Sequence, residues 1–377
     1  MNVSAPGKLL LFGEHAAVYG HPAVGVTLPF TLTLRCVPAD RFSIGMAGTE
    51  LPPGRGTEPD RGTERGRGTE PDRGTEPDRG TEPDRGTELP PDRARAFQAH
   101  LETVIRETPD ARLPRERCEI ISELPIGGGF GSSAALCTAL ARRILPPESA
   151  TDRVWSVAHR LEHFFHGTPS GIDTGLSCRS GAWAFRFVLD RGGDAADREG
   201  SPGSIDDRSS DTVQKSSGEM EDQTRTAPEL PRAEAVSLPP AVLVAGSIPR
   251  ETSTRDLVAG VRARHDADPN RYGDVLQRLG ELSDETARDA SRDRSAFALR
   301  VDEAQQRLTE LGVSSPALER IIATGRSAGA MAGKLSGAGG GGAFFLVCRD
   351  TRCAENVRRA LSKLDDTPAA LFTVPLG

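Results

Sequence analysis

The sequence predicts an α+β fold divided into two domains. Its 377 residues are too many for one small hydrophobic core and suit two. Segments with strand and helix periodicity are mixed without a regular βαβ alternation, which favours α+β over a doubly wound sheet. Hydrophobic residues make up only 36% of the chain, and most of the deficit lies in two polar tracts that we expect to be insertions into this fold.

The first half of the chain is expected to supply a sheet and three helices. Residues 24–37 alternate Val, Thr and Leu as a strand or hairpin does. Residues 94–107 place Phe97 and Leu101 on one helical face, and residues 131–145 are rich in alanine, a strong helix former. The expected strands are 4–12, 24–37 and 118–126, and the expected helices are 94–107, 131–145 and 152–167.

The second half begins with strands and continues as a run of helices. The expected strands are 181–189, 241–245, 343–349 and 371–375. The expected helices lie near 254–264, 271–290, 294–311, 315–329 and 352–363. We therefore expect an N-terminal domain over residues 1–180 and a C-terminal domain over residues 181–377.

Two tracts interrupt these domains. Residues 54–93 repeat a hexapeptide, mostly RGTEPD, with 8 Arg against 11 Asp and Glu, and residues 190–235 contain 6 Lys and Arg against 12 Asp and Glu. Neither tract has the apolar side chains whose burial would offset about 1–2 kcal/mol of backbone entropy per residue. We expect both to be disordered insertions; a charged interaction arm is the alternative for the repeat.

Composition excludes several classes of protein. The net charge of −7 comes from the two tracts, so the rest is close to neutral and has no basic stripe for nucleic acid. No apolar run approaches the 18 residues of a membrane span. The six cysteines form no CxxC pair and no metal-binding spacing. We therefore expect free thiols and a cytoplasmic protein.

The segment PIGGGFGSSAAL is the most informative motif. A strand ends at Ile126, four glycines follow within five positions, and Ser132 and Ser133 open the alanine-rich helix. Glycines let backbone N–H groups surround an anion, and the helix N-terminus adds a positive dipole end. A serine hydroxyl there can reach a magnesium ion held by phosphates. The alternative is an ordinary turn with a serine cap. No Lys follows the glycines, so this is not a Walker A loop.

Charged residues elsewhere complete a set suited to phosphoryl transfer. They are Lys8, Glu14, His15, Glu162 and Asp173, and a second glycine loop, KLSGAGGGG, precedes the strand at 343–349. Phosphoryl transfer needs positioning and neutralisation of spread negative charge more than covalent chemistry. Taken singly, each residue has a plain alternative, such as a solvated lysine, the polar face of a helix or a turn cap. His159 and His163 have metal-ligand spacing, but the HExxH pattern is absent.

These motifs, in this order, resemble those of the GHMP kinase superfamily, and the mevalonate kinases most closely. The similar segments are SAPGKLLLFGEHAAVYGHPA, ELPIGGGFGSSAAL, HGTPSGIDT, PRETSTRDLVAGV and KLSGAGGGGAFFLV. They span nearly all of the chain outside the two tracts. The resemblance implies an N-terminal ATP-binding domain similar to domain 2 of ribosomal protein S5 and a ferredoxin-like C-terminal domain.

The resemblance also implies roles for individual residues. Asp173 would be the catalytic base, and Lys8 would pair with it and lower the pKa of the acceptor hydroxyl. Ser133 and Glu162 would ligate Mg²⁺. The ATP-binding positions would be Ser122, Gly127, Gly128, Gly129, Phe130, Gly131, Ser132 and Ser133. The substrate-binding positions would be Glu14, His15, Thr254 and Gly337.

The implied reaction transfers phosphate from ATP to the 5-hydroxyl of (R)-mevalonate, with Mg²⁺ as cofactor. The expected partners are ATP and mevalonate, with a homodimer as a further possibility. The alternatives are a related kinase acting on phosphomevalonate or another small hydroxylated substrate, and a catalytically silent binding protein of this fold. Phe130 is larger than the family's usual residue. The spacing from Arg250 to Leu257 is two residues longer than usual, so either Arg250 or Arg255 would meet the substrate carboxylate.

Overall fold

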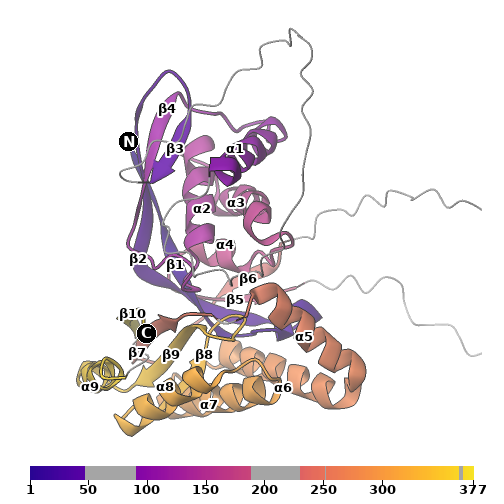
Figure 1. Ribbon diagram of the computed structural model, residues 1–377, viewed down its shortest axis with the longest axis vertical. Coiled ribbons are helices and arrows are strands. Elements are labelled where there is room, and N and C mark those ends of the chain that lie inside the picture. Colours follow the sequence, from indigo (N-terminus) through magenta and orange to yellow (C-terminus); the bar gives the residue numbers. More distant parts are fainter. Residues whose placement is uncertain (47–90, 188–229, 251, 365–367) are drawn as a thin grey trace, which may run out of the picture.

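The computed structural model describes residues 1–46, 91–187, 230–250, 252–364 and 368–377. These residues form two units, each built from a sheet with helices packed on it (Figure 1). The α+β class and the two-part organisation expected from the sequence are confirmed.

The first unit is organised around one long strand, β2 (Ala23–Pro38). It pairs with β1 (Asn2–Phe12) along most of its length, with β4 (Glu116–Ser122) near its C-terminal end and with β5 (Ala182–Arg186) near its N-terminal end. Strand β3 (Ser43–Met46) pairs in parallel with β4, and β6 (Arg232–Ala235) pairs with β5. Because three strands share β2, residues from distant parts of the sequence meet along it.

Four helices gather on one side of this sheet (Figure 1). They are α1 (Pro91–Arg106), α2 (Ser132–Ile144), α3 (Thr151–His166) and α4 (Ile172–Ser177). Helix α2 is buried along most of its length and contacts β1, β2, α3 and α4, which explains its small residues. The glycine loop leads directly into α2, so this central helix fixes the position of the loop.

The second unit contains a four-stranded antiparallel sheet. Its strands are β7 (Ala241–Ile248), β8 (Ala332–Leu335), β9 (Gly342–Cys348) and β10 (Ala370–Leu376), in the order β10-β7-β9-β8. This order is that of a ferredoxin-like sheet, as expected. Strand β9 is buried at every position, which explains its continuous apolar sequence.

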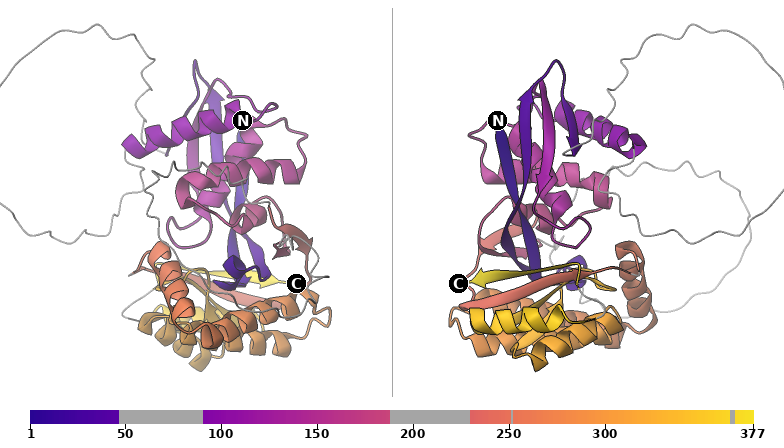
Figure 2. Two further views of the ribbon diagram at one scale, coloured as in Figure 1. Left: turned by 90° about the vertical axis from the view of Figure 1, so that its right-hand side faces the viewer. Right: turned by 60° about the vertical axis from the view of Figure 1, so that its left-hand side comes forward.

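Five helices complete the second unit. They are α5 (Thr254–Ala267), α6 (Pro269–Arg288), α7 (Arg294–Glu310), α8 (Pro316–Ser327) and α9 (Thr351–Leu361). Helices α6 to α9 lie on the side of the sheet turned away from the first unit (Figure 2). Polar side chains cap α5 to α9 at their N-termini, each accepting a hydrogen bond from the first turn.

The two units meet where β1 and β2 reach the second sheet (Figures 1 and 2). Phe12, the last residue of β1, packs edge-on against Phe297 of α7 with ring centroids 5.9 Å apart. The short 3₁₀ helix η1 (Ala16–Tyr19) contacts α6. A side chain at Gly280 of α6 would collide with the ring of His21, so the glycine permits this close approach.

Several expectations about local structure are wrong. Residues 91–93, expected within the first disordered tract, begin helix α1. Residues 232–235, expected within the second, form β6 and pair with β5. Residues 230 and 231 of the second tract are also described, whereas residues 54–90 and 190–229 lie outside the described part. The structure also contains β3, β8 and the short helix α4, none of which the sequence patterns predicted.

The boundary expected at residue 180 stays a prediction. Strands β5 and β6 follow that position and belong to the first sheet. Among the described residues, no helix is both long and apolar enough to cross a membrane.

The expectation that all cysteines are free is wrong for one pair. Cys36 of β2 and Cys118 of β4 are opposite each other in the strand register and form a disulfide. Spacing gave no signal because the two are separated by 82 positions and meet only through the pairing of their strands. Cys137, Cys178, Cys348 and Cys353 are free and buried.

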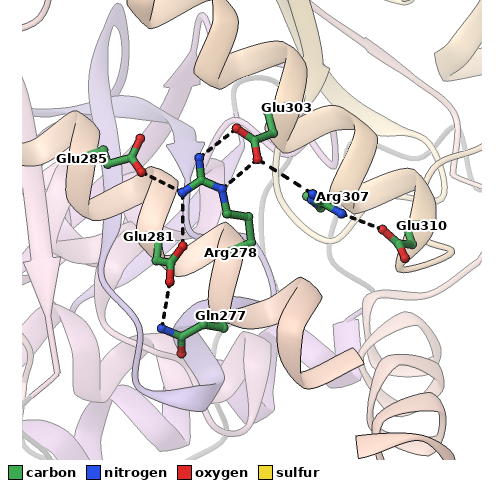
Figure 3. Close-up of polar contacts among 7 residues, drawn as sticks. All are labelled: Gln277, Arg278, Glu281, Glu285, Glu303, Arg307 and Glu310. Atoms are coloured by element: carbon green, nitrogen blue, oxygen red, sulfur yellow. Dashed lines mark hydrogen bonds and ion pairs between the residues drawn. The ribbon is translucent and has the colours of Figure 1, made fainter. Parts of the chain in front are cut away.

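Helices α6 and α7 are joined by a charged network centred on Arg278 (Figure 3). Its guanidinium donates two hydrogen bonds to Glu303 of α7, at 2.7 and 2.9 Å, and others to Glu281 and Glu285 of its own helix. The bonds to Glu303 lower the pKa of that carboxyl and raise that of Arg278, and the pKa of Glu281 is lowered by a hydrogen bond from Gln277 and then by the bond from Arg278. A single cation therefore holds three carboxylates together.

We predict that Arg278→Met destabilises the protein by about 1 kcal/mol at pH 7, since a partly exposed network is screened by water. Methionine has a similar helix propensity, so the loss reports the network alone. The pKa values of Glu281 and Glu303 are lowered in the folded protein. The two carboxylates therefore stabilise the fold fully above pH ~4.5, the ordinary glutamate pKa, and this stabilisation is lost as the pH falls through the lowered pKa values. Urea denaturation at pH 7 and pH 3 measures the loss of stability. Arg358→Met, at an exposed position of α9, is the control. An equal loss at both pH values would contradict the electrostatic explanation.

Candidate active site

The Lys8 ammonium and the Asp173 carboxylate meet although their residues lie far apart in the sequence. Lys8 Nζ is 3.0 Å from Asp173 Oδ2. The lysine is buried on β1, whereas about a third of the aspartate side chain is exposed. Asp173 lies in the first turn of α4. A ligand can therefore reach the Asp173 carboxylate. The Lys8 ammonium that holds this carboxylate is buried and is not easily displaced by the ligand.

The glycine loop packs directly on Lys8. The Lys8 backbone N–H donates to the carbonyl of Phe130 at 2.9 Å. Gly131, the residue before α2, has a φ of 77°, and a Cβ there would lie 2.7 Å from Lys8 Cγ. Only glycine accepts both the positive φ and the contact. The loop and the N-terminus of α2 are thereby placed beside the Lys8–Asp173 pair, with Gly127 exposed and Ser133 half-buried.

Glu162 lies beneath this pair, almost completely buried on α3. Its exposed fraction is 1%, and neither carboxylate oxygen has a hydrogen-bond partner. Burial, and then the charge of Asp173, raise the pKa of Glu162 to about 8, although Lys8 acts in the opposite direction. A carboxylate without a partner is costly to bury, so the position indicates a group that binds a cation.

The residues expected to hold Mg²⁺ fit a hard cation. Glu162 offers two free oxygens, and Ser133, in the first turn of α2, offers a hydroxyl. The Ser133 hydroxyl is 3.1 Å from Nε2 of His166, and His166 in turn interacts electrostatically with Asp173 and Lys8. Oxygen donors of this kind are those that Mg²⁺ prefers, together with substrate phosphates. The metal role of Ser133 and Glu162 stays a prediction.

Arg250 joins this cluster from the second unit. A Cβ at Gly129 of the first glycine loop would lie 3.3 Å from its guanidinium, and one at Gly342 after the second loop would lie 2.5 Å away. Arg250 also interacts electrostatically with Asp173 and donates to Thr254 Oγ1 at 2.9 Å. Arg255 is exposed on α5. Of the two arginines left open by the sequence, Arg250 is therefore the one beside Asp173.

Glu14 and His15 occupy a tight turn after β1, and both are buried. Burial lowers the pKa of His15, so its imidazole is neutral at pH 7. His15 Nε2 is 2.9 Å from the carbonyl of Ala338 in the second glycine loop, and it must donate, since a carbonyl only accepts. This leaves Nδ1 with a lone pair that can accept a hydrogen bond. Glu14 forms an ion pair with Lys334 of β8.

The remaining predicted positions are less directly placed. Phe130 is completely buried and packs against Phe372 of β10, so its side chain supports the loop and only its backbone can face a nucleotide. Ser122 exchanges hydrogen bonds with the backbone of Leu124 in a local turn. Thr254 begins α5 beside Arg250, and Gly337 has a φ of 87° within the second glycine loop. The binding roles of these residues stay predictions.

Two residues near the site were not assigned by sequence reasoning. His166 lies on the same helix as His159 and His163. The spacing of His159 and His163 suggested a metal site, so no role was assigned to His166. His159 is buried with its pKa lowered to about 4 by burial, and it faces His163 at a ring distance of 4.9 Å. Lys334 precedes the second glycine loop, and the only available signal was a lysine inside an otherwise apolar strand.

Comparisons with known proteins agree with this geometry. Residues 95–181 match the GHMP kinases N-terminal domain, and residues 286–366 match the GHMP kinases C-terminal domain. The chain therefore contains segments that match both domains of the GHMP kinases.

Within that superfamily the chain is similar to mevalonate kinases. It is 27% identical to the mevalonate kinase of Pyrococcus abyssi over 354 residues, which covers 91% of this chain and 87% of the relative. The crystal structure of L. major mevalonate kinase in complex with R-mevalonate has a TM-score of 0.66 at 16% identity and covers 99% of this chain and 95% of that one. Streptococcus pneumoniae phosphomevalonate kinase has the same TM-score at 13% identity, with all of both chains covered. At such identities the solved structures show the fold alone.

We predict that Glu162→Gln lowers turnover by a factor on the order of 100, because the cation loses a charged ligand. The melting temperature measured at pH 9 without divalent cations should stay unchanged or rise, because above the raised pKa of about 8 Glu162 is an unpaired carboxylate, and a neutral amide is less costly to bury. Steady-state kinetics and thermal denaturation test the two effects. Glu355→Gln, at an exposed position of α9, is the control. A variant that unfolds at lower temperature and keeps its turnover would show that Glu162 is structural.

Proposed function

We propose that this protein is a mevalonate kinase, which transfers the γ-phosphoryl group of ATP to the 5-hydroxyl of (R)-mevalonate. The observation that carries the proposal is the contact between Lys8 and the accessible carboxylate of Asp173 beside a glycine loop at the start of a helix. The similarity to mevalonate kinases over 91% of the chain supports this choice of acceptor.

Asp173 is the group proposed to accept the proton of the attacking hydroxyl. It is the only one of the two neighbouring carboxylates that is open to solvent, since Glu162 is almost completely buried. Lys8 lies 3.0 Å away and stabilises negative charge on the aspartate and on an alkoxide forming beside it. Two carboxylates with such different environments suit two different roles.

The nucleotide is proposed to bind at the glycine loop. Its phosphates would meet the backbone N–H groups of residues 127–132 and the positive end of α2. Bound Mg²⁺ would neutralise the phosphate oxygens and so favour attack at the γ-phosphorus. Ser133 and Glu162 would hold the ion, and the adenine pocket is not assigned to residues.

The acceptor is proposed to bind between the two units. Arg250 supplies a guanidinium beside Asp173, and a fixed fork of N–H donors suits a carboxylate. Glu14 and the neutral His15 supply hydrogen-bond acceptors for hydroxyl groups. In mevalonate, the carboxylate would meet Arg250, the hydroxyl that is not phosphorylated would meet Glu14 or His15, and the 5-hydroxyl would meet Asp173.

The main rival is a related kinase that acts on phosphomevalonate or another hydroxylated substrate, because the fold is shared with phosphomevalonate kinase. Catalytic silence is disfavoured because Lys8, Glu162 and Asp173 are present and the lysine contacts the aspartate. A cytoplasmic location and a homodimer stay predictions.

We predict ADP release with ATP, Mg²⁺ and (R)-mevalonate, and at least tenfold lower kcat/KM with phosphomevalonate or galactose. Asp173→Asn should keep the circular dichroism spectrum and lower kcat by about 10²–10⁴-fold, since it removes a general base. A coupled ADP assay over this substrate panel measures both. Preference for phosphomevalonate would establish the rival function, and near-normal turnover of Asp173→Asn would exclude the mechanism.

We predict that Arg250→Gln raises KM for mevalonate by about tenfold or more and leaves KM for ATP nearly unchanged, because the guanidinium faces the acceptor. Arg255→Gln is the matched control, since Arg255 is exposed five positions further on, and its constants should equal those of the unaltered protein. If Arg255→Gln were the variant that loses acceptor affinity, the assignment of the two arginines would be reversed.

A further inference from the structure

The turn that carries Glu14 and His15 has an unusual backbone. The N–H of Ala16 donates to the carbonyl of Glu14 at 2.6 Å, and His15 between them has φ 58° and ψ −39°. This is a γ-turn with positive φ, a rare conformation for a residue with a side chain. Such a turn is strained and persists only where its surroundings hold it.

The surroundings that hold this turn belong to the second unit. Lys334 of β8 forms an ion pair with Glu14, and the Ala338 carbonyl accepts from His15 Nε2 at 2.9 Å. Between them, Ser336 Oγ donates to the carbonyl of Leu10 at 2.8 Å. Residues 334 and 336 lie on the same face of an extended segment because side chains alternate along it. One short segment therefore fastens the strained turn in two places and the strand that leads into it in a third.

Lys334 is enclosed to an unusual degree for a lysine. Its side chain and that of Glu14 both have an exposed fraction of 0%. Its ammonium also donates to the carbonyl of Leu335 at 2.7 Å and lies 5.9 Å from the Phe12 ring and 5.3 Å from the Phe345 ring. A buried ion pair contributes little net stability compared with well-packed apolar residues, so folding alone does not explain it.

Glu14 uses only one of its two carboxylate oxygens in this pair. Oε1 contacts Lys334, whereas Oε2 is buried and has no hydrogen-bond partner. A buried carboxylate oxygen without a partner is rare unless a ligand supplies the missing hydrogen bond. Glu14 lies on the same turn as His15, so its free oxygen and the His15 imidazole are presented by one short segment.

We propose that Lys334 is the positioning residue of the acceptor pocket: by holding Oε1 of Glu14 it fixes the strained turn and leaves Oε2 to accept a hydrogen bond from a substrate hydroxyl. The proposal rests on the proposed function, because it assigns this pocket to the phosphoryl acceptor. Lys334 itself touches neither substrate nor nucleotide. Its removal is therefore expected to weaken binding of the acceptor, and not of ATP.

The test replaces Lys334 by methionine, which has a similar length and no charge. In Lys334→Met, KM for mevalonate should rise about tenfold or more while KM for ATP changes by less than about twofold. A residue with a merely structural role would not separate the two constants in this way. Equal increases in both constants, or an unchanged KM for mevalonate, would overturn the proposal.

A second variant covers the case in which Lys334→Met does not fold, because it leaves the Glu14 charge unpaired. Lys334→Met combined with Glu14→Gln removes both charges, and its melting temperature should return toward that of the unaltered protein. Its KM for mevalonate should remain raised about tenfold or more, because the carboxylate oxygen is missing. A folded double variant with normal acceptor KM would overturn the proposal.

Arg300→Met provides a matched control in the same unit. Arg300 forms a partly buried ion pair with Asp289 at 2.5 Å, away from the pocket, and its loss should lower stability without changing either KM.

Assays of the unaltered protein separate the proposed function from the positioning role of Lys334. If it phosphorylates another member of the substrate panel instead of mevalonate, the proposed substrate fails and the Lys334 effect is measured on that acceptor. If it phosphorylates mevalonate and Lys334→Met keeps normal constants, only the positioning proposal fails.

Discussion

The site depends on the close packing of the Lys8 side chain against Gly131. The lysine stem lies where a side chain at position 131 would be, and this contact brings its ammonium to Asp173 and its backbone N–H to the Phe130 carbonyl. One strand thereby positions the phosphate loop and the proposed base relative to each other. Because β1 is also bound along its length to β2, the alignment is built into the sheet and does not rely on a mobile surface loop.

Charge in the site is arranged by burial as much as by contact. Glu162 and Asp173 both lie near Lys8, yet one is sealed from water and the other is partly open. The second unit contributes Arg250, which is exposed, and Lys334, which forms a buried ion pair with Glu14 of the first unit. The nucleotide side of the site is thus formed mainly by the first unit, and the acceptor side by both, which places the transfer at their junction.

Much of this could be predicted from sequence, for identifiable reasons. The long helices and strands follow from apolar periodicity, and Lys8, Asp173 and the glycine loop were expected as a group from motif order. Strand β6 was missed because its alternating residues adjoin a polar tract, and α4 because six residues are too few for a periodic signal. The Cys36–Cys118 disulfide, the position of Arg250 beside Asp173 and the ion pair between Lys334 and Glu14 depend on which distant segments become neighbours, and local patterns do not contain that information.

The aromatic contact behind the glycine loop joins two residues that are added to the growing chain at widely separated times during translation. Phe130 rests on Phe372, which in turn touches Phe30, with ring centroids 4.9 and 4.8 Å apart. During translation the loop is made long before β10, so for most of that period it has no aromatic backing. The ribosome-bound chain can therefore pair the strands of its first sheet before Phe130 has this support. The aromatic backing of the loop is complete only once β10 has docked.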